Sequence, residues 1–101
     1  MNTTITLYGQ KVKIAINKGT YSMGNRTALE AVGCEDGDPF GFITVNIPDV
    51  PLKANEICVK TWSENSWVLQ LLTLLPNNFK DTGKIIPCGY ADAQIWEFKN
   101  C

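Results

Sequence analysis

The first sixteen residues contain two stretches in which hydrophobic and polar positions alternate, residues 4–8 and residues 11–16. A period of two predicts strands with one buried face and one exposed face. Gly9-Gln10 lies between them and is typical of a two-residue hairpin turn, because glycine adopts the unusual backbone angles of such turns. We therefore predict an antiparallel hairpin whose inward-facing residues are Ile5, Leu7, Val12, Ile14 and Ile16.

Three further segments are predicted as strands. Residues 26–33 favour a helix by propensity but lie between strand signals, and we predict a strand there. Residues 40–47 are rich in β-branched and aromatic side chains and give the strongest strand pattern of the chain. Pro48 ends this strand because proline has no amide hydrogen to donate. A short apolar strand follows at residues 56–59.

A helical spacing replaces the alternation at residues 63–75, where apolar residues from Trp67 onward form one broad stripe. Ser63 suits the N-cap position, since its hydroxyl can accept a bond from a free amide of the first turn. Glu64 suits the positive end of the helix dipole, and Pro76 stops the helix. One main α-helix is predicted here.

Residues 81–84 predict a turn, and residues 91–99 predict a last alternating strand with Trp96 as a core residue. The predicted fold is α+β, a mostly antiparallel β-sheet with one main α-helix (about residues 63–75) packed on one face. The length fits a single domain, residues 1–101, because two separate cores would each be near the lower limit for folding.

The composition is that of a globular protein, with 45% hydrophobic and 19% charged residues. The longest apolar run, residues 67–75, is far shorter than the roughly 20 residues needed to cross a bilayer. The N-terminus has neither the basic nor the apolar region of a secretion signal. These features predict a cytoplasmic protein without membrane association.

Histidine is absent, so the chain lacks the commonest general base and a frequent zinc ligand. We expect no metal, no cofactor and no disulfide framework, because the cysteines lie far apart and form no Cys-x-x-Cys pair. Asp36 and Asp38 have the spacing of a calcium loop, but the later acidic ligands are missing. Three cysteines are expected to be buried or half-buried thiols, and the fourth is terminal: Cys34, Cys58, Cys88 and Cys101.

The net charge of −1 is unevenly distributed. Residues 1–26 carry four basic and no acidic residues, whereas residues 27–52 carry five acidic and no basic residues. This asymmetry can steer a charged partner, or neighbouring strands can pair the opposite charges and cancel the field. There is no basic stripe of the kind that nucleic-acid binders carry, so direct binding to nucleic acid is not expected.

A dense polar cluster surrounds the predicted helix start. If the cluster is catalytic, Lys60 could act as a base for Ser63. If it is structural, Ser63 and Glu64 cap the helix, and Asn65 is exposed or forms a hydrogen bond to a neighbouring loop. Trp62 either packs against the first helical turn as a hydrophobic staple or is an exposed anchor for a partner.

Two motifs carry a family resemblance. Thr44-Val45-Asn46-Ile47-Pro48 ends the predicted strand, and Lys60-Thr61-Trp62-Ser63-Glu64-Asn65 precedes the predicted helix. Residues 38–98 resemble short proteins of Gram-positive plasmids, integrative elements and phages with a TVN-(aliphatic)-P … KxxSEN signature. Some accessory proteins of this type are anti-CRISPRs, which bind an RNA-guided nuclease.

The resemblance implies a small mobile-element protein that binds and inhibits a host defence protein by occlusion, with an RNA-guided nuclease of a CRISPR system as the expected partner. Two other readings stay open: a small hydrolase that uses the Lys60/Ser63/Glu64 cluster, and a homodimeric or larger homo-oligomeric regulatory domain. The residues expected to contact the partner are Glu35, Asp36, Asp38, Lys60, Trp62, Glu64 and Asn65.

Overall fold

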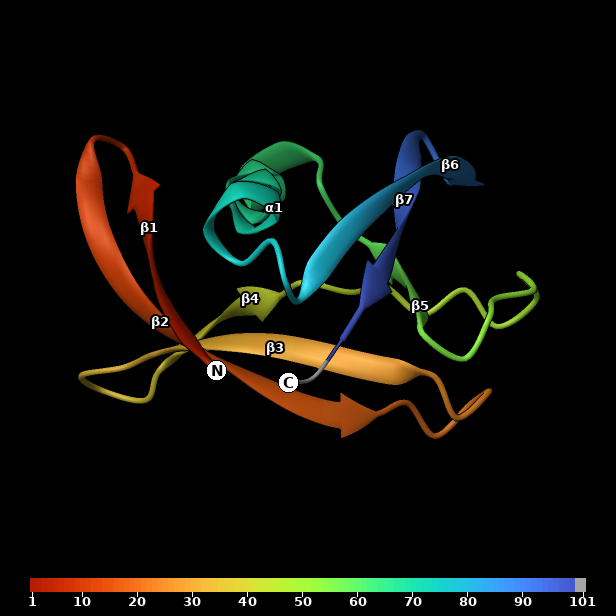
Figure 1. Cartoon of the computed structure of the whole chain (residues 1–101), viewed down its shortest axis with the longest axis horizontal. Helices are drawn as coiled ribbons and strands as arrows, with labels where there is room; N and C mark the ends of the chain where they lie inside the picture. Colours follow the sequence, from red (N-terminus) through yellow and green to blue (C-terminus); the bar gives the residue numbers. More distant parts are fainter. Residues whose placement is uncertain (100–101) are drawn as a thin grey trace.

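The computed structural model describes residues 1–99 and places Glu64 by its backbone alone. In this part of the chain the elements run from the N-terminal hairpin through a helical segment to a C-terminal hairpin (Figure 1). None of its helices is long and apolar enough to cross a membrane. The strands are β1 (Asn2–Leu7), β2 (Gln10–Thr20), β3 (Thr27–Gly33), β4 (Pro39–Phe42), β5 (Glu56–Val59), β6 (Phe79–Cys88) and β7 (Ala91–Phe98), and the helical segment is η1 (Ser63–Gln70) followed by α1 (Leu71–Leu74).

Strands β1 and β2 form the predicted antiparallel hairpin. Its turn residues are Tyr8 and Gly9, one position earlier than predicted, and their φ angles are 51° and 76°. Two successive positive φ angles define a type I′ turn, whose twist matches that of the flanking strands. Ile5 and Ile14 are fully buried, so the predicted inward face is confirmed.

The first hairpin belongs to a four-stranded antiparallel sheet with the order β1-β2-β3-β4. Strand β3 confirms the strand prediction for residues 26–33, because its buried residues Leu29 and Ala31 alternate with partly exposed ones. Residues 34–38 join β3 to β4. In Figure 1 the long strand β2 curves strongly, which brings β1 up beside the helical segment.

The predicted strand at residues 40–47 is wrong in its extent, because β4 ends at Phe42. The Ile43 N–H still donates to the Leu29 carbonyl of β3, but the Val45 N–H donates to the Cys58 carbonyl of β5. The chain therefore changes its hydrogen-bonding partner from one sheet to the other within two residues. Burial does not alternate through this crossing, because Ile43 and Thr44 are both buried. The run of β-branched and aromatic residues therefore resembled one long strand by composition and not by its burial.

The second sheet is three-stranded and antiparallel, with the order β5-β7-β6. Strand β7 is central, and both of its faces are buried, with Ile95 on one side and Trp96 on the other. The turn predicted at residues 81–84 is instead an irregularity inside β6, where the register against β7 shifts and Gly83 has a φ of 82°. The last strand is confirmed.

The helical segment lies where the sequence predicts it, but most of it is a 3-10 helix and only residues 71–74 are α-helical. The prediction of Ser63 as N-cap is wrong, because no side chain caps this helix and Ser63 itself has a φ of 58°. Serine and asparagine side chains compete for backbone hydrogen bonds, and three of the first four residues are of these types. The tighter 3-10 form at the N-terminal part is consistent with that competition.

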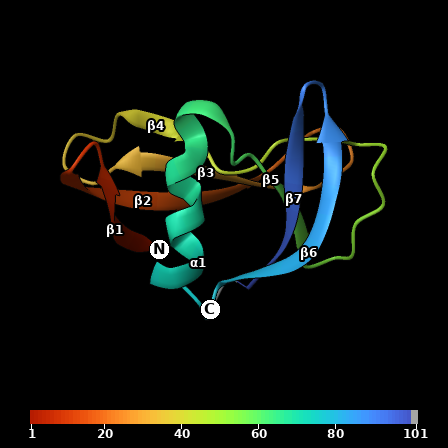
Figure 2. The same ribbon diagram turned by 90° about the horizontal axis from the view of Figure 1, so that it is seen from above.

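Side-chain amides of η1 bind the two outer strands of the four-stranded sheet. The Gln70 amide accepts from the Thr6 N–H of β1 at 2.8 Å and donates to the Thr6 carbonyl at 2.7 Å. At the other end of η1 the Asn65 amide donates to the Phe42 carbonyl of β4 at 3.0 Å. Figure 2 shows the helical segment between β1 and β4 on one side and the second sheet on the other.

The main core draws on both sheets and on the helical segment. Trp67, Val68 and Leu71 point into it from the helical segment, and Trp96 and Phe79 from the second sheet. The remaining buried members are Ile5, Ile14, Ile16, Leu29, Ala31, Ile43, Ile57, Val59 and Phe98. A smaller cluster of Cys58, Ala93 and Ile95 lies on the opposite face of β7.

Candidate functional site

An aromatic hollow opens between the tip of the first hairpin, β4 and the start of η1. Its volume is about 310 Å³. We call this site the aromatic hollow and define it by its lining residues: Leu7, Tyr8, Phe40, Gly41, Phe42, Lys60, Asn65 and Trp67. Because three separate elements supply these residues, the hollow depends on the complete fold of the first sheet and the helical segment.

The aromatic side chains of the hollow differ in exposure. Trp67 forms its floor, being buried, and packs edge-on against Phe40 with 5.0 Å between ring centroids and an interplanar angle of 81°. This edge-to-face geometry is favourable for aromatic pairs. Phe42 remains 48% exposed and Tyr8 91% exposed. The hollow therefore has a fixed aromatic base and two aromatic rings at its rim that water still reaches.

Tyr8 is unfavourably placed for folding on two counts. Its backbone occupies the left-handed region, which glycine and asparagine adopt far more readily than tyrosine. Its ring contributes almost nothing to the core, because nine tenths of the residue is exposed. A costly conformation that brings no packing gain is a reason to look for a function.

Asn65 builds the wall of the hollow between Lys60 and β4. Its side chain is 6% exposed and donates to the carbonyls of Phe42, at 3.0 Å, and Lys60, at 2.6 Å. The Lys60 N–H in turn donates to the Ile43 carbonyl at 2.9 Å. These bonds fix the loop before η1 against the end of β4. Asn65 therefore bonds a loop, as one of the two interpretations of the polar cluster predicts, and it positions Lys60.

The other residues of the polar cluster do not line the aromatic hollow. Ser63 is exposed and lines a second hollow with Thr6, Ser66 and Gln70, which adjoins the aromatic hollow because Leu7, Tyr8 and Trp67 line both. Trp62 is partly buried against the smaller cluster on β7, so the predicted staple with the first helical turn is not what packs it. The side chain of Glu64 lies outside the described part of the structure.

The three predicted acidic contacts form an exposed turn between β3 and β4. The Asp36 carboxylate accepts from the Asp38 N–H at 3.0 Å, and the Gly37 N–H donates to the Gly33 carbonyl. A Cβ on Gly33 would clash with that carboxylate, so a larger residue there would have to displace the Asp36 side chain. Glu35 is exposed on the same turn.

The acidic turn also faces the basic residues of β2. Lys11 and Lys13 line an outer hollow together with Glu35 and Asp36. Opposite charges thus lie across one surface depression, which weakens the field of both groups at a distance. The charge asymmetry of the sequence had two interpretations, steering of a charged partner and cancellation of opposite charges on neighbouring strands. Cancellation applies to this part of the surface.

The first motif of the resemblance has a structural role. The Thr44 hydroxyl oxygen accepts from the Leu29 N–H at 3.1 Å and lies 2.8 Å from the Tyr21 hydroxyl. The Asn46 amide donates to the Met23 carbonyl at 3.1 Å. These bonds fasten the loop between β2 and β3 to the segment that crosses between the sheets.

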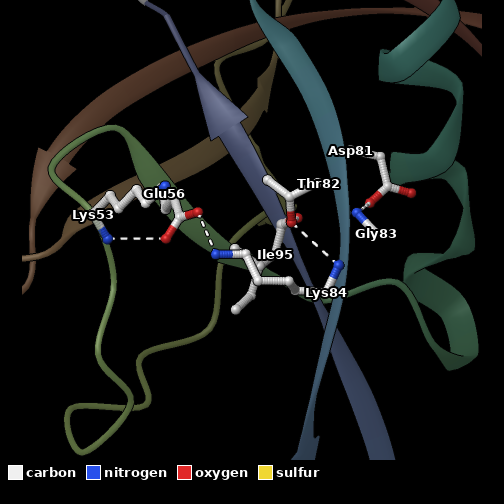
Figure 3. A network of polar contacts seen from close by, with 7 residues as sticks. All are labelled: Lys53, Glu56, Asp81, Thr82, Gly83, Lys84 and Ile95. Atoms are coloured by element: carbon white, nitrogen blue, oxygen red, sulfur yellow. Dashed lines mark hydrogen bonds and ion pairs between the residues drawn. The ribbon is translucent and has the colours of Figure 1, made fainter.

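A buried carboxylate links β5 to β6 across the central strand (Figure 3). Glu56 accepts from the Lys53 N–H at 2.9 Å and pairs with the Lys84 ammonium at 2.8 Å. These two partners hold the pKa of Glu56 below its ordinary value of 4.5, the backbone hydrogen bond from Lys53 having the largest effect. The pair is remote from the aromatic hollow and belongs to the second sheet.

The cysteine predictions are partly wrong. Cys58 is buried and Cys88 half-buried, as predicted, but Cys34 is exposed because it lies in the acidic turn and not in a strand. Burial raises the pKa of the Cys58 thiol above its ordinary value of 9.0. All three are free thiols, and Cys101 lies outside the described residues. Within residues 1–99 no group of metal-ligating side chains comes together.

The sequence patterns found part of the aromatic hollow and missed the rest. Lys60 and Asn65 line the hollow and were among the partner contacts predicted from the sequence. Tyr8, Phe40 and Phe42 also line it but were predicted only as strand residues. The signal for Tyr8 was its position directly before Gly9, since a type I′ turn takes two residues with positive φ. Comparison with known protein families, curated proteins and solved structures gives no significant match.

Proposed function

We propose that this protein is a noncatalytic inhibitor that binds another protein and occludes its working surface. The observation that carries the proposal is Tyr8, whose ring is 91% exposed on a backbone conformation that disfavours tyrosine. Partly exposed aromatic residues around a fixed pocket are typical of the hot spots of protein interfaces. The proposed binding surface is the rim of the aromatic hollow together with the acidic turn.

The chain connects these two parts directly. Asp38 is followed by Pro39, the first residue of β4, and then by Phe40 in the wall of the hollow. Asp38 is not among the residues that line the outer hollow with Lys11 and Lys13, so one negative side chain remains beside the aromatic anchor, an arrangement that supports binding to a basic protein surface. An acidic turn can enter a basic nucleic-acid channel without the whole protein imitating DNA.

The class of partner in this proposal is a host defence protein. The resemblance of residues 38–98 to mobile-element proteins supports it, and an RNA-guided nuclease is the first partner to test. In this proposal the protein acts in the bacterial cytoplasm and binds neither nucleic acid nor membrane. The helical segment packs on one face of the β-structure as a support for the hollow, which fits the burial of Trp67 and Leu71.

The test is an affinity capture with the tagged protein from a bacterial lysate supplemented with a purified nuclease–guide complex. We expect the nuclease to be retained and its cleavage of target DNA to fall in proportion to binding. Tyr8→Asn should weaken capture, because it removes the rim aromatic while keeping a residue that tolerates the turn conformation. Tyr90→Asn is the matched control, since Tyr90 is also a fully exposed tyrosine at a hairpin tip, in the other sheet.

Equal loss of capture in both variants, or retention of no defence protein by the unmodified chain, would overturn the proposal. The hydrolase alternative needs Lys60 to reach Ser63, and the part of the chain that the structure describes contains no hydrogen bond between these two residues, which line adjoining hollows. Turnover of nucleic acid or protein substrate by the purified chain alone would favour that alternative and contradict ours.

A further inference from the structure

The chemistry of the aromatic hollow restricts what can occupy it. Its four aromatic residues supply apolar surface beside nearly as much polar surface, and Lys60 is the one charged residue among the eight that line it. A pocket with aromatic surface, polar groups and a single positive charge favours a ligand that carries an aromatic group, hydrogen-bonding groups and one negative charge.

The backbone of β4 adds a hydrogen-bond donor at the rim of the hollow. The Ile43 N–H bonds to Leu29, so the antiparallel alternation makes Phe42 and Glu30 a non-hydrogen-bonded pair. The Phe42 N–H and C=O consequently point away from β3, and Asn65 occupies the C=O. Among the described contacts none uses the Phe42 N–H, so this group remains available to a backbone lying alongside β4.

Size and charge favour a peptide segment over other ligands. A volume of about 310 Å³ is at the lower end of the roughly 300–1,000 Å³ of ligand pockets, which suits one or two side chains. A nucleic-acid strand could stack on the aromatic rings, but its next phosphates would approach Asp38 and the other acids of the neighbouring turn. An extended peptide can place one carboxylate without bringing further negative charge.

We propose that the aromatic hollow binds an extended segment of the partner protein. An aromatic side chain of that segment enters between Tyr8 and Phe42, its backbone accepts from the Phe42 N–H, and a carboxylate two residues further on pairs with Lys60. Side chains two apart share a face of an extended chain, which sets this spacing. This inference rests on the proposed function, because it specifies what the binding surface recognises.

The test titrates the isotope-labelled protein with the capped pentapeptide acetyl-Gly-Phe-Thr-Asp-Gly-amide and follows amide chemical shifts. We expect the shifts of Tyr8, Gly41 and Phe42 to move, and the Asp peptide to bind roughly three- to fivefold more tightly than its Asn counterpart. Lys60→Gln should remove that difference between the two peptides. Lys80→Gln, a change at an exposed lysine of β6, should leave it intact.

Three results would overturn the inference. They are equal affinity for the Asp and Asn peptides, shift changes confined to residues outside the hollow, and tighter binding of an octathymidylate than of the Asp peptide. The two proposals fail separately. If Lys60→Gln and Phe42→Ser capture the nuclease as well as the unmodified chain does, the protein is still an inhibitor but the hollow is not its anchor. If the peptide binds and no defence protein is captured, the hollow is a peptide site and the inhibitor proposal is wrong.

Discussion

At the residue scale, the backbone of Tyr8 has a φ of 51°, a conformation in which asparagine is more stable than tyrosine. We predict that Tyr8→Asn stabilises the fold, because Asn-Gly is a favoured pair for a type I′ turn. The expected gain is on the order of 1 kcal/mol in the free energy of unfolding. Thermal unfolding followed by circular dichroism should show a Tm higher by about 5 °C.

A lower Tm for Tyr8→Asn would mean that the tyrosine ring stabilises the hairpin after all. In that case the exposed ring would need no functional explanation, and the observation behind the proposed function would lose its force. Tyr90→Asn gives the baseline for removing a hairpin-tip tyrosine, since φ is not positive at Tyr90.

Glu56 makes a second residue-scale prediction, which concerns pH. Its pKa is lower in the folded protein than its ordinary value of 4.5, so its ionised form stabilises the fold. That contribution is fully present above pH 4.5 and is lost as the pH falls through the lowered pKa of the folded state. Urea unfolding should therefore show a stability difference between the unmodified chain and Glu56→Gln that is constant at pH 6–7 and shrinks in acid.

Glu30→Gln is a suitable comparison, because Glu30 lies in the other sheet and outside the Glu56–Lys84 pair. A Glu56→Gln effect that persists unchanged down to pH 3 would show that the charge of Glu56 contributes nothing and that only its shape matters.

At the element scale, the short helix η1 is held to β4 by one asparagine side chain. Asn65→Ala would leave the Phe42 and Lys60 carbonyls without their donor in a part-buried place. We expect a loss of about 2–3 kcal/mol in the free energy of unfolding, since buried polar groups without partners are costly. Urea denaturation of the variant and of the unmodified chain measures this difference in the free energy of unfolding.

Asn78→Ala is the matched control for this loss. The Asn78 amide likewise donates to a backbone carbonyl, that of Lys99, but this hydrogen bond lies in an exposed position. Equal effects of the two substitutions would contradict the structural role assigned to Asn65.

The elements show what a hydrophobic pattern can predict. Alternation located β1, β2 and the final strand, because each stays within one sheet along its length and has a buried face. Strand β3 was predicted from its position between strand signals. The hydrophobic pattern failed after Phe42, where apolar residues continue along the chain while the hydrogen-bond partner changes from Leu29 to Cys58. The pattern records burial and is silent about which strand supplies the partner. The 3-10 form of η1 was likewise missed, since apolar spacing is similar in both helix types.

The candidate site was less predictable than the fold for a related reason. Phe40 and Phe42 were assigned to a strand, and nothing local indicated that β4 ends at an edge beside the first hairpin. Lys60 and Asn65 could be singled out because they belong to the dense polar cluster before the helix. Their hydrogen bonds to Ile43 and Phe42 depend on how distant segments of the chain come together, which the sequence does not encode locally.

At the scale of the whole molecule, Gln70 protects the outer edge of the four-stranded sheet. Its amide pairs with both backbone groups of Thr6 and so occupies part of the edge of β1. Unpaired edges invite association with another strand. We predict that Gln70→Ala increases self-association, which sedimentation velocity in reducing buffer would detect as a concentration-dependent rise in mean mass.

Gln10→Ala provides the comparison, because Gln10 is exposed at the start of β2 and makes no described side-chain hydrogen bond. If both variants remain as monomeric as the unmodified chain, the Gln70 contact is not what keeps β1 from pairing.

The passage of the chain between the sheets at Ile43–Val45 has a consequence for how the protein opens. Ile43 donates to the first sheet and Val45 to the second, so neither sheet can come apart without disturbing this strip of backbone. Amide hydrogen exchange should accordingly give Ile43 and Val45 the same opening free energy, equal to that of global unfolding. Slower exchange at one of them than at the other would instead reveal two sheets that melt one after the other.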